Sequence, residues 1–186
     1  MLDNQLRLHI GHVQIHRRGY HANPAVERFF RKAEALRQQV AAEPEVRAAA
    51  PRVLVHGLLS SAYNNGGVQL VGVAPEAESL VTFIADQIVA GRYLTGEGSE
   101  ILIGERLARK LEVRLGDRVV AMAARPDGQI GSEVFRVVGL FRTVSADFDR
   151  TMAFIPIDRA RAMLGLPPTP PTNWPCSSTT PARPTP

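Results

Sequence analysis

The stretch from Glu100 to Val120 constrains the fold more than any other part of the sequence. It opens with three consecutive aliphatic residues, Ile101 to Ile103, which are typical of a buried strand. A glycine and a short run with helical spacing follow, and the apolar residues of that run share one face: Leu107, Ala108 and Leu111. The turn residues Leu115 to Asp117 then lead into a second strand over 118–124. The stretch therefore predicts strand, helix, turn and strand, and it contains no catalytic motif.

A βαβ-like unit is predicted for the first sixty residues. Alternating apolar residues favour a strand over 5–16, and Pro24 fits the first position of a helix that runs to about Ala42. A second long strand is expected over 46–61. Of the histidines in the first strand, His12 and His16 lie about 13 Å apart at the usual rise per residue, too far to share a metal ion without a bend. We therefore expect no metal site and no cofactor.

The rest of the folded part is predicted to be rich in strands. Gly139 is expected to mark a β-bulge in the long strand near the end of this part. Residues 145–150 read as a polar, exposed loop, and Asp158 is a reasonable N-cap for the last helix. The expected elements are a strand over 68–74, a helix over 80–89, strands over 101–103, 118–124, 132–144 and 152–156, and helices over 105–111 and 159–164.

Composition excludes several classes of function. The net charge of +4 is mild and its basic residues are scattered, so no nucleic-acid partner is expected. A single cysteine, Cys176, rules out an internal disulfide framework. No apolar run of membrane-spanning length and no signal peptide are seen in the chain as given. Residues 167–186 contain eight prolines and almost no apolar residues, which predicts a disordered tail.

Several motifs, taken in order, resemble the MacB-like periplasmic core domain of FtsX-type ABC transporter permeases, a family that includes the lipoprotein-releasing permeases. The densest resemblance lies in Ile101 to Val120, with its glycine, its helix and its Gly-Asp turn. The other matching segments are Gly11 to Ile15, Val46 to Pro51, Val71 to Glu76, Ile88 to Leu94, Phe135 to Leu140 and Met152 to Ile157. Together they cover about residues 5–166.

The resemblance implies an α+β fold with two lobes. One is a βαβ-type lobe formed by residues 5–60 and 147–166, and the other is a β-rich lobe inserted between them at 61–146, followed by the tail at 167–186. In the family this domain lies between the first two of four membrane helices, on the periplasmic face of the bacterial inner membrane. Because neither flanking helix is in the sequence, the chain resembles a truncated permease, with a tail that is native or the product of a frameshift.

The resemblance also implies a function and partners. Such permeases pair with a second permease subunit and an ABC ATPase, and their periplasmic domain couples ATP-driven motion to export or release of a lipoprotein, lipid, peptide or drug. Mechanical coupling needs no catalytic residues. Two predicted loops, 95–99 and 145–150, are candidates for partner contact, and in the second the candidate residues are Asp147, Phe148, Asp149 and Arg150.

Two alternatives remain open at this point. The helix and Leu-Gly-Asp turn also resemble parts of small β-barrel modules that bind ligands, although the N-terminal βαβ unit argues against that reading. An enzyme would need an arrangement of residues that no spacing in the sequence supports. The side chains available for it are His56, Ser60, Ser61, Asp117 and Asp127.

Overall fold

A computed structural model describes residues 13–16 and 33–167 of the chain. Residues 13–16 belong to no strand or helix, so this end of the strand predicted over 5–16 is wrong. The rest of that strand, the first part of the predicted helix from Pro24 and the tail from residue 168 lie outside the described residues. No helix in the described part is both long enough and apolar enough to cross a membrane.

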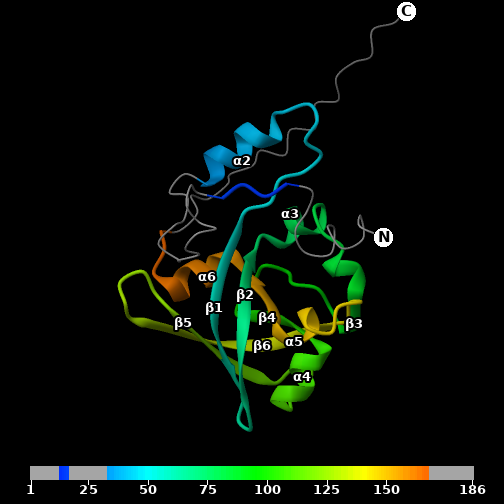
Figure 1. Cartoon of the computed structure of the whole chain (residues 1–186), viewed down its shortest axis with the longest axis vertical. Coiled ribbons are helices and arrows are strands. Elements are labelled where there is room, and N and C mark those ends of the chain that lie inside the picture. Colours follow the sequence, from blue (N-terminus) through cyan, green and yellow to red (C-terminus); the bar gives the residue numbers. More distant parts are fainter. Residues whose placement is uncertain (1–12, 17–32, 168–186) are drawn as a thin grey trace, which may run out of the picture.

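Seven strands and several short helices make up the described part (Figure 1). The strands are β1 (Arg52–Ser60), β2 (Asn65–Val73), β3 (Ile88–Gly91), β4 (Glu100–Gly104), β5 (Arg118–Ala124), β6 (Ile130–Phe141) and β7 (Met152–Pro156). The helices are α2 (Ala33–Ala41), α3 (Pro75–Ser79), the 3-10 helix η1 (Ile84–Gln87), α4 (Glu105–Leu111), α5 (Phe148–Thr151) and α6 (Ile157–Leu164). The fold is therefore mixed α and β, as predicted.

The strands form one sheet in the order β3-β6-β4-β7-β2-β1-β5, and β5 also pairs with β6. This second pairing closes every strand except β3 into a ring. Strand β6 makes closure possible because its first half pairs with β5 and its second half pairs with β4. At Arg136 both neighbours are present, with Arg118 opposite on one side and Glu100 on the other. The result is a small barrel-like sheet with α6 near one end and α4 near the other (Figure 1).

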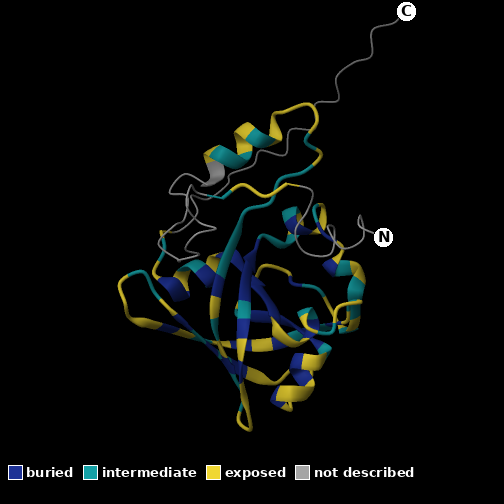
Figure 2. Ribbon diagram, viewed as in Figure 1, coloured by how far each residue is buried: buried dark blue, intermediate teal, exposed yellow. Residues whose placement is uncertain are grey.

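The interior of the ring is filled with apolar side chains. Figure 2 shows that many residues along its strands are buried. Every second residue of the strands points inward, as strand geometry requires. Helix α4 adds Leu107 and Leu111 to this core, and α6 adds Ala160, Met163 and Leu164. The two helices therefore close the ends of the ring with the same apolar cluster that fills it.

A second apolar cluster covers the outside of the central strands. Phe154 of β7 and Leu102 of β4 belong to it, although their neighbours Ala153 and Ile103 belong to the interior core. The outer cluster is covered by η1, β3 and α5, which contribute Ile84, Ile88 and Phe148. All residues of β4 and β7 are buried as a result. Burial on both faces explains why these strands are continuous apolar runs in the sequence.

The part of the fold predicted from Glu100 to Val120 is confirmed. Helix α4 and strand β5 have the predicted bounds, and β4 contains the predicted strand 101–103. Glu112 ends the helix in the left-handed conformation, and Gly116 has a φ of +88° in the turn that follows. The Asp117 carboxylate accepts a hydrogen bond of 2.8 Å from the backbone N–H of Arg114, which closes that turn.

The helix predicted over 80–89 is wrong except at Ile84–Gln87, where the short 3-10 helix η1 forms. The chain forms α3 earlier, with Pro75 at its first turn, and the Glu78 side chain is held by Arg52 at 2.6 Å and by Thr82 at 3.0 Å. Leu80, the first residue of the predicted helix, is 71% exposed. The residues from 88 onward pair with β6 instead, and this pairing satisfies backbone groups of β6 that would otherwise be left at the edge of the sheet.

Two smaller expectations have mixed outcomes. The bulge predicted at Gly139 is confirmed, since the β4–β6 register skips from Val137 to Gly139. The predicted N-cap Asp158 is wrong, because α6 begins at Ile157 and its N-cap is Pro156.

The two-lobed division stays a prediction. In the described residues, β1 and β7 from one predicted lobe pair with β2, β4 and β5 from the other.

The interior core gives the first testable prediction. Leu107→Ala removes a fully buried side chain and should lower the free energy of unfolding by about 2–5 kcal/mol. The matched control is Leu80→Ala, which removes a side chain that is 71% exposed and should change stability by less than about 0.5 kcal/mol. Urea denaturation followed by circular dichroism measures both. Equal losses for the two variants would contradict the described core and the corrected position of Leu80.

Candidate functional site

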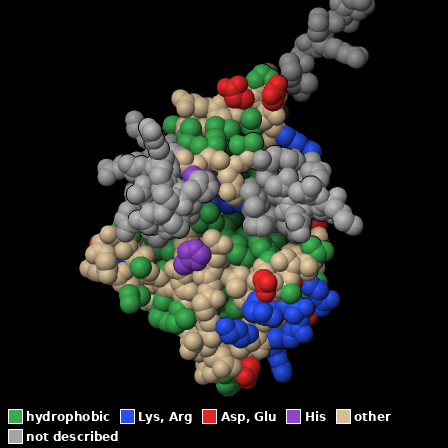
Figure 3. All heavy atoms as spheres, in the orientation of Figure 1, with side chains coloured by type: hydrophobic (Ala, Val, Ile, Leu, Met, Phe, Trp, Pro, Cys, Tyr) green, Lys and Arg blue, Asp and Glu red, His purple; other side chains and the backbone are tan. Residues whose placement is uncertain are grey.

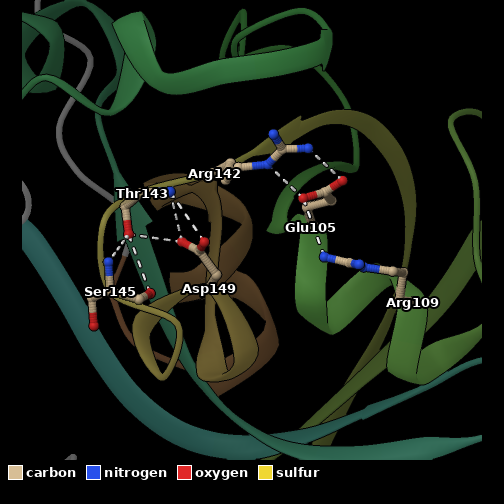
Figure 4. A network of polar contacts seen from close by, with 6 residues as sticks. All are labelled: Glu105, Arg109, Arg142, Thr143, Ser145 and Asp149. Carbon is tan, nitrogen blue, oxygen red and sulfur yellow. Dashed lines mark hydrogen bonds and ion pairs between the residues drawn. The ribbon is translucent and has the colours of Figure 1, made fainter.

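The most connected polar network lies where β4 and β6 end (Figure 4). These two strands are parallel, so their carboxyl ends meet at the same edge of the sheet. Strand β4 leads into α4 at Glu105, and β6 leads into a loop that begins at Arg142 and returns through α5 to β7. Side chains that are far apart in the sequence are therefore brought together at this edge.

Glu105 is the centre of one half of the network. Arg142 donates two hydrogen bonds to it, from Nε at 2.7 Å and from a terminal nitrogen at 2.8 Å, and Arg109 approaches the same carboxylate at 3.3 Å. The hydrogen bonds from Arg142 hold the pKa of the Glu105 carboxyl below its ordinary value and raise the pKa of Arg142. Glu105 is therefore a permanent anion at neutral pH and ties α4 to the end of β6.

Asp149 is the centre of the other half. It is buried, and its carboxylate accepts hydrogen bonds from the backbone N–H of Thr143 at 2.9 Å and from the Thr143 hydroxyl at 2.8 Å. The Thr143 hydroxyl oxygen in turn accepts the backbone N–H of Ser145 at 3.1 Å. The backbone N–H of Asp149 donates to the Ser145 carbonyl at 3.1 Å. These bonds fix the course of the loop between β6 and α5.

The two halves meet at a close backbone contact. A Cβ added to Gly104 would lie 2.0 Å from the carbonyl oxygen of Asp149, which is far inside van der Waals contact. Glycine is therefore required here so that the backbone of α5 can lie directly against the junction of β4 and α4. Phe148 reinforces the contact from the other side, since its ring lies 5.8 Å from that of Phe141 and 6.3 Å from that of Phe154.

The four residues predicted to contact a partner fall into two pairs. Asp147 and Arg150 point outward, with side chains that are 92% and 53% exposed and form a long ion pair of 3.5 Å. Phe148 and Asp149 point inward, so the expectation that this whole segment is an exposed loop is wrong. It forms α5 because Phe148 fills the outer apolar cluster and Asp149 caps the loop. Partner contact through Asp147 and Arg150 stays a prediction.

The other loop predicted to contact a partner is exposed at residues 95–98. Its start is tied to the sheet by Glu100, which accepts hydrogen bonds from Arg92 and from both the backbone and the hydroxyl of Thr95. Burial opposes ionisation of Glu100, yet the hydrogen bonds from Arg92 and Thr95 outweigh burial and lower its pKa. Contact of this loop with a partner also stays a prediction.

The residues that an enzyme would have needed are not brought together. The Ser61 hydroxyl donates to the Leu111 carbonyl at 2.7 Å, whereas Asp117 and Asp127 each accept a backbone N–H inside separate turns. His56 lies on β1, opposite Gln69 of β2, and is exposed. No group of three or more potential metal-ligating side chains is present among the described residues. The polar residues of the described part thus serve turns and contacts between elements.

The comparison with protein families decides the identity of the domain. Residues 2–174 match the MacB-like periplasmic core domain. The chain belongs to this family. The match confirms the resemblance drawn from the sequence motifs, and it makes the chain a periplasmic domain of the ABC permease type.

Two similar proteins support the assignment. Over 131 residues the chain is 31% identical to the lipoprotein-releasing system transmembrane protein LolC of Neisseria meningitidis serogroup B. That alignment covers 65% of this chain and 31% of LolC, so the chain spans about a third of its relative's length. The extracellular domain of the noncanonic ABC-type transporter YknZ from Gram-positive bacteria has a similar fold, with a TM-score of 0.56 at 17% identity. This second match covers 78% of this chain and 71% of that domain.

Sequence reasoning did not find Glu105, Arg142 or Thr143 as members of a site. Their juxtaposition depends on β4 and β6 being parallel neighbours, and no local pattern in the sequence reports which strands pair. Gly104 carried a usable signal, since a glycine between a buried strand and a helix indicates a close backbone approach.

The backbone contact at Gly104 gives the second prediction. Gly104→Ala places a methyl group against the Asp149 carbonyl and should lower the free energy of unfolding by about 1–3 kcal/mol. The control is Gly67→Ala on β2, where an added Cβ meets nothing within 4 Å. Thermal unfolding of both variants measures the difference. A Gly104→Ala protein as stable as Gly67→Ala would contradict the contact.

The ion pair of Glu105 gives the third prediction. Because the folded-state pKa of Glu105 is lowered, its contribution to stability is present above the ordinary pKa of 4.5 and is lost as the pH falls through the lowered value. Glu105→Gln should therefore be slightly less stable than the wild type at pH 7, and the difference should vanish in acid. The effect is small because Arg142 is largely exposed. Urea denaturation across this pH range tests it, and a difference that grows on acidification would contradict the ion pair.

Proposed function

We propose that this domain transmits ATP-driven motion of an ABC transporter permease to its cargo on the outer side of the inner membrane. The cargo class we infer is a lipoprotein, lipid, peptide or drug. The partners are an ABC ATPase and a second permease subunit, both reached through membrane helices of the permease. The observation that carries the proposal is the family match over residues 2–174.

The internal construction of the domain supports a mechanical role. A closed ring of paired strands with filled ends resists deformation better than an open sheet, because no strand of the ring can separate without breaking backbone hydrogen bonds on two sides. The ties of Glu105 and Asp149 extend this rigidity to the helices at the edge of the ring. A force applied at one end is thus carried to the other by the body as a whole.

A barrel-like ring is also compatible with the alternative function, a ligand-binding module. Its interior is occupied by fully buried side chains such as Leu59, Phe135 and Ile103, so a ligand would have to bind on the outer surface. The family match favours the transporter role.

A chimeric permease tests the proposal and gives the fourth prediction. The matching segment of a full-length lipoprotein-releasing permease is replaced by this domain and reconstituted with the ATPase in proteoliposomes. We expect ATP-dependent release of a lipoprotein. Flexible Gly/Ser insertions at both junctions with the membrane helices should leave ATP hydrolysis intact but reduce release, because flexible linkers transmit little force.

Two controls make this experiment decisive. A permease that lacks the domain establishes the background of release, and a chimera with Leu80→Ala controls for substitution in an exposed residue. Release that is unchanged by the Gly/Ser insertions, or equal with and without the domain, would contradict mechanical coupling.

A further inference from the structure

Three exposed basic side chains lie on the solvent face of α4, with the partly buried Glu105 at its start and Glu112 just after its end. Leu107, Ala108 and Leu111 of this helix are buried in the interior core. The three exposed residues of the helix are Arg106, Arg109 and Lys110. Their spacing places them side by side on the outer surface of the helix. Figure 3 shows Lys and Arg side chains gathered at the lower right of the view, over the region of α4 and α5.

This surface has a local excess of positive charge. Within the described part of the chain, Arg106 and Lys110 form no ion pair, while Arg109 and Arg142 share the single carboxylate of Glu105. Like charges at this spacing repel one another and weaken a helix. An anionic partner would reduce this repulsion.

An exposed aromatic residue stands beside the same surface. The tip of the β1–β2 hairpin is fixed to the end of α4, since Ser61 donates to the Leu111 carbonyl at 2.7 Å and Asn64 donates to Glu112 at 2.8 Å. Lys110 lies across the start of β2, where its Nζ would be 2.9 Å from a Cβ added to Gly66. Between Ser61 and Asn64, Tyr63 is 74% exposed.

We propose that this face, formed by Tyr63, Arg106, Arg109 and Lys110, is a docking surface for an acidic segment of a protein partner. Tyrosine and arginine are among the residues enriched at protein interfaces. Here the arginines lie on a helix, and Tyr63 lies in a turn that is hydrogen-bonded to the end of that helix. Charge complementarity selects the partner, and the Tyr63 ring supplies apolar contact at the edge. This surface is distinct from Asp147 and Arg150, the outward pair at the N-cap and inside α5.

Its position favours a protein over a lipid surface. Helix α4 and the hairpin tip lie at the end of the ring opposite α2 and the carboxyl end of α6 (Figure 1). If the proposed function holds, the membrane helices continue from the ends of the chain, so this surface faces away from the bilayer and toward proteins on the outer side. The inference rests on the proposed function for this orientation only, and the surface itself follows from the contacts above.

Binding of the full chain to a fluorescein-labelled oligoglutamate peptide, measured by anisotropy, tests the proposal and gives the fifth prediction. We expect salt-dependent binding. The double variant Arg106→Gln/Lys110→Gln should weaken it by about tenfold at low salt, because it removes two cations that pair with no carboxylate. Tyr63→Ser should weaken it by about fivefold and leave its salt dependence unchanged. Circular dichroism confirms that the variants fold.

The matched control is Arg47→Gln, which neutralises an exposed arginine in the segment that leads from α2 to β1. We expect wild-type binding for this variant. The same loss of binding free energy per charge removed, by Arg47→Gln and by the double variant, would mean attraction by net charge alone and would overturn the proposal. Retention of wild-type affinity by the double variant would also overturn it.

A second assay measures binding of the chain to vesicles of phosphatidylglycerol and phosphatidylcholine. Binding to these vesicles without binding to the peptide would assign the surface to anionic lipid and overturn the proposal. No permease, ATPase or nucleotide is present in these measurements. Their failure would therefore leave the result of the chimeric transporter untouched, and failure of the chimera would leave the docking surface untouched.

Discussion

The pairing of β5 with both β1 and β6 is the interaction on which the rest of this domain depends. Without it, the strands would form an open sheet whose inner face could not be covered by two helices as short as α4 and α6. With it, alternate residues of six strands point into one enclosed core, and the helices need only fill the two ends. The long strand β6 makes this arrangement possible, because its first half pairs with β5 and its second half pairs with β3 and β4.

Placement of α4 follows from the closed ring. The carboxyl ends of β4 and β6 must be adjacent once the strands are paired, so Glu105 and Arg142 meet there. The return of the chain through α5 then requires a backbone contact at Gly104, and Asp149 fixes the loop that makes it. The polar network at the edge of the sheet is therefore a consequence of the strand pairing, of the backbone contact at Gly104 and of the loop fixed by Asp149.

Local patterns in the sequence predicted the elements better than their arrangement. The bounds of α4 and β5 follow from an apolar stripe, a glycine and a Gly-Asp turn, all of which act within a few residues. The helix expected over 80–89 failed because its apolar residues are recruited separately, Ile84 by the outer cluster and Ile88 by pairing with β6, while Leu80 is left in solvent. Asp149 was read as exposed since nothing in the sequence shows that Thr143 would bind it. Ring closure, like any contact between distant strands, leaves no signature in a local pattern.

Strand β3 has a consequence for how such a domain meets other chains. Because β5 is paired along both sides from Val120 to Ala123, the closed part of the sheet offers no free edge there. The strand at the other end of the order, β3, is only four residues long and ends in a glycine with positive φ. Short, irregular edges of this kind discourage the addition of a strand from another molecule. At this end of the sheet the domain is thus protected against edge-to-edge aggregation.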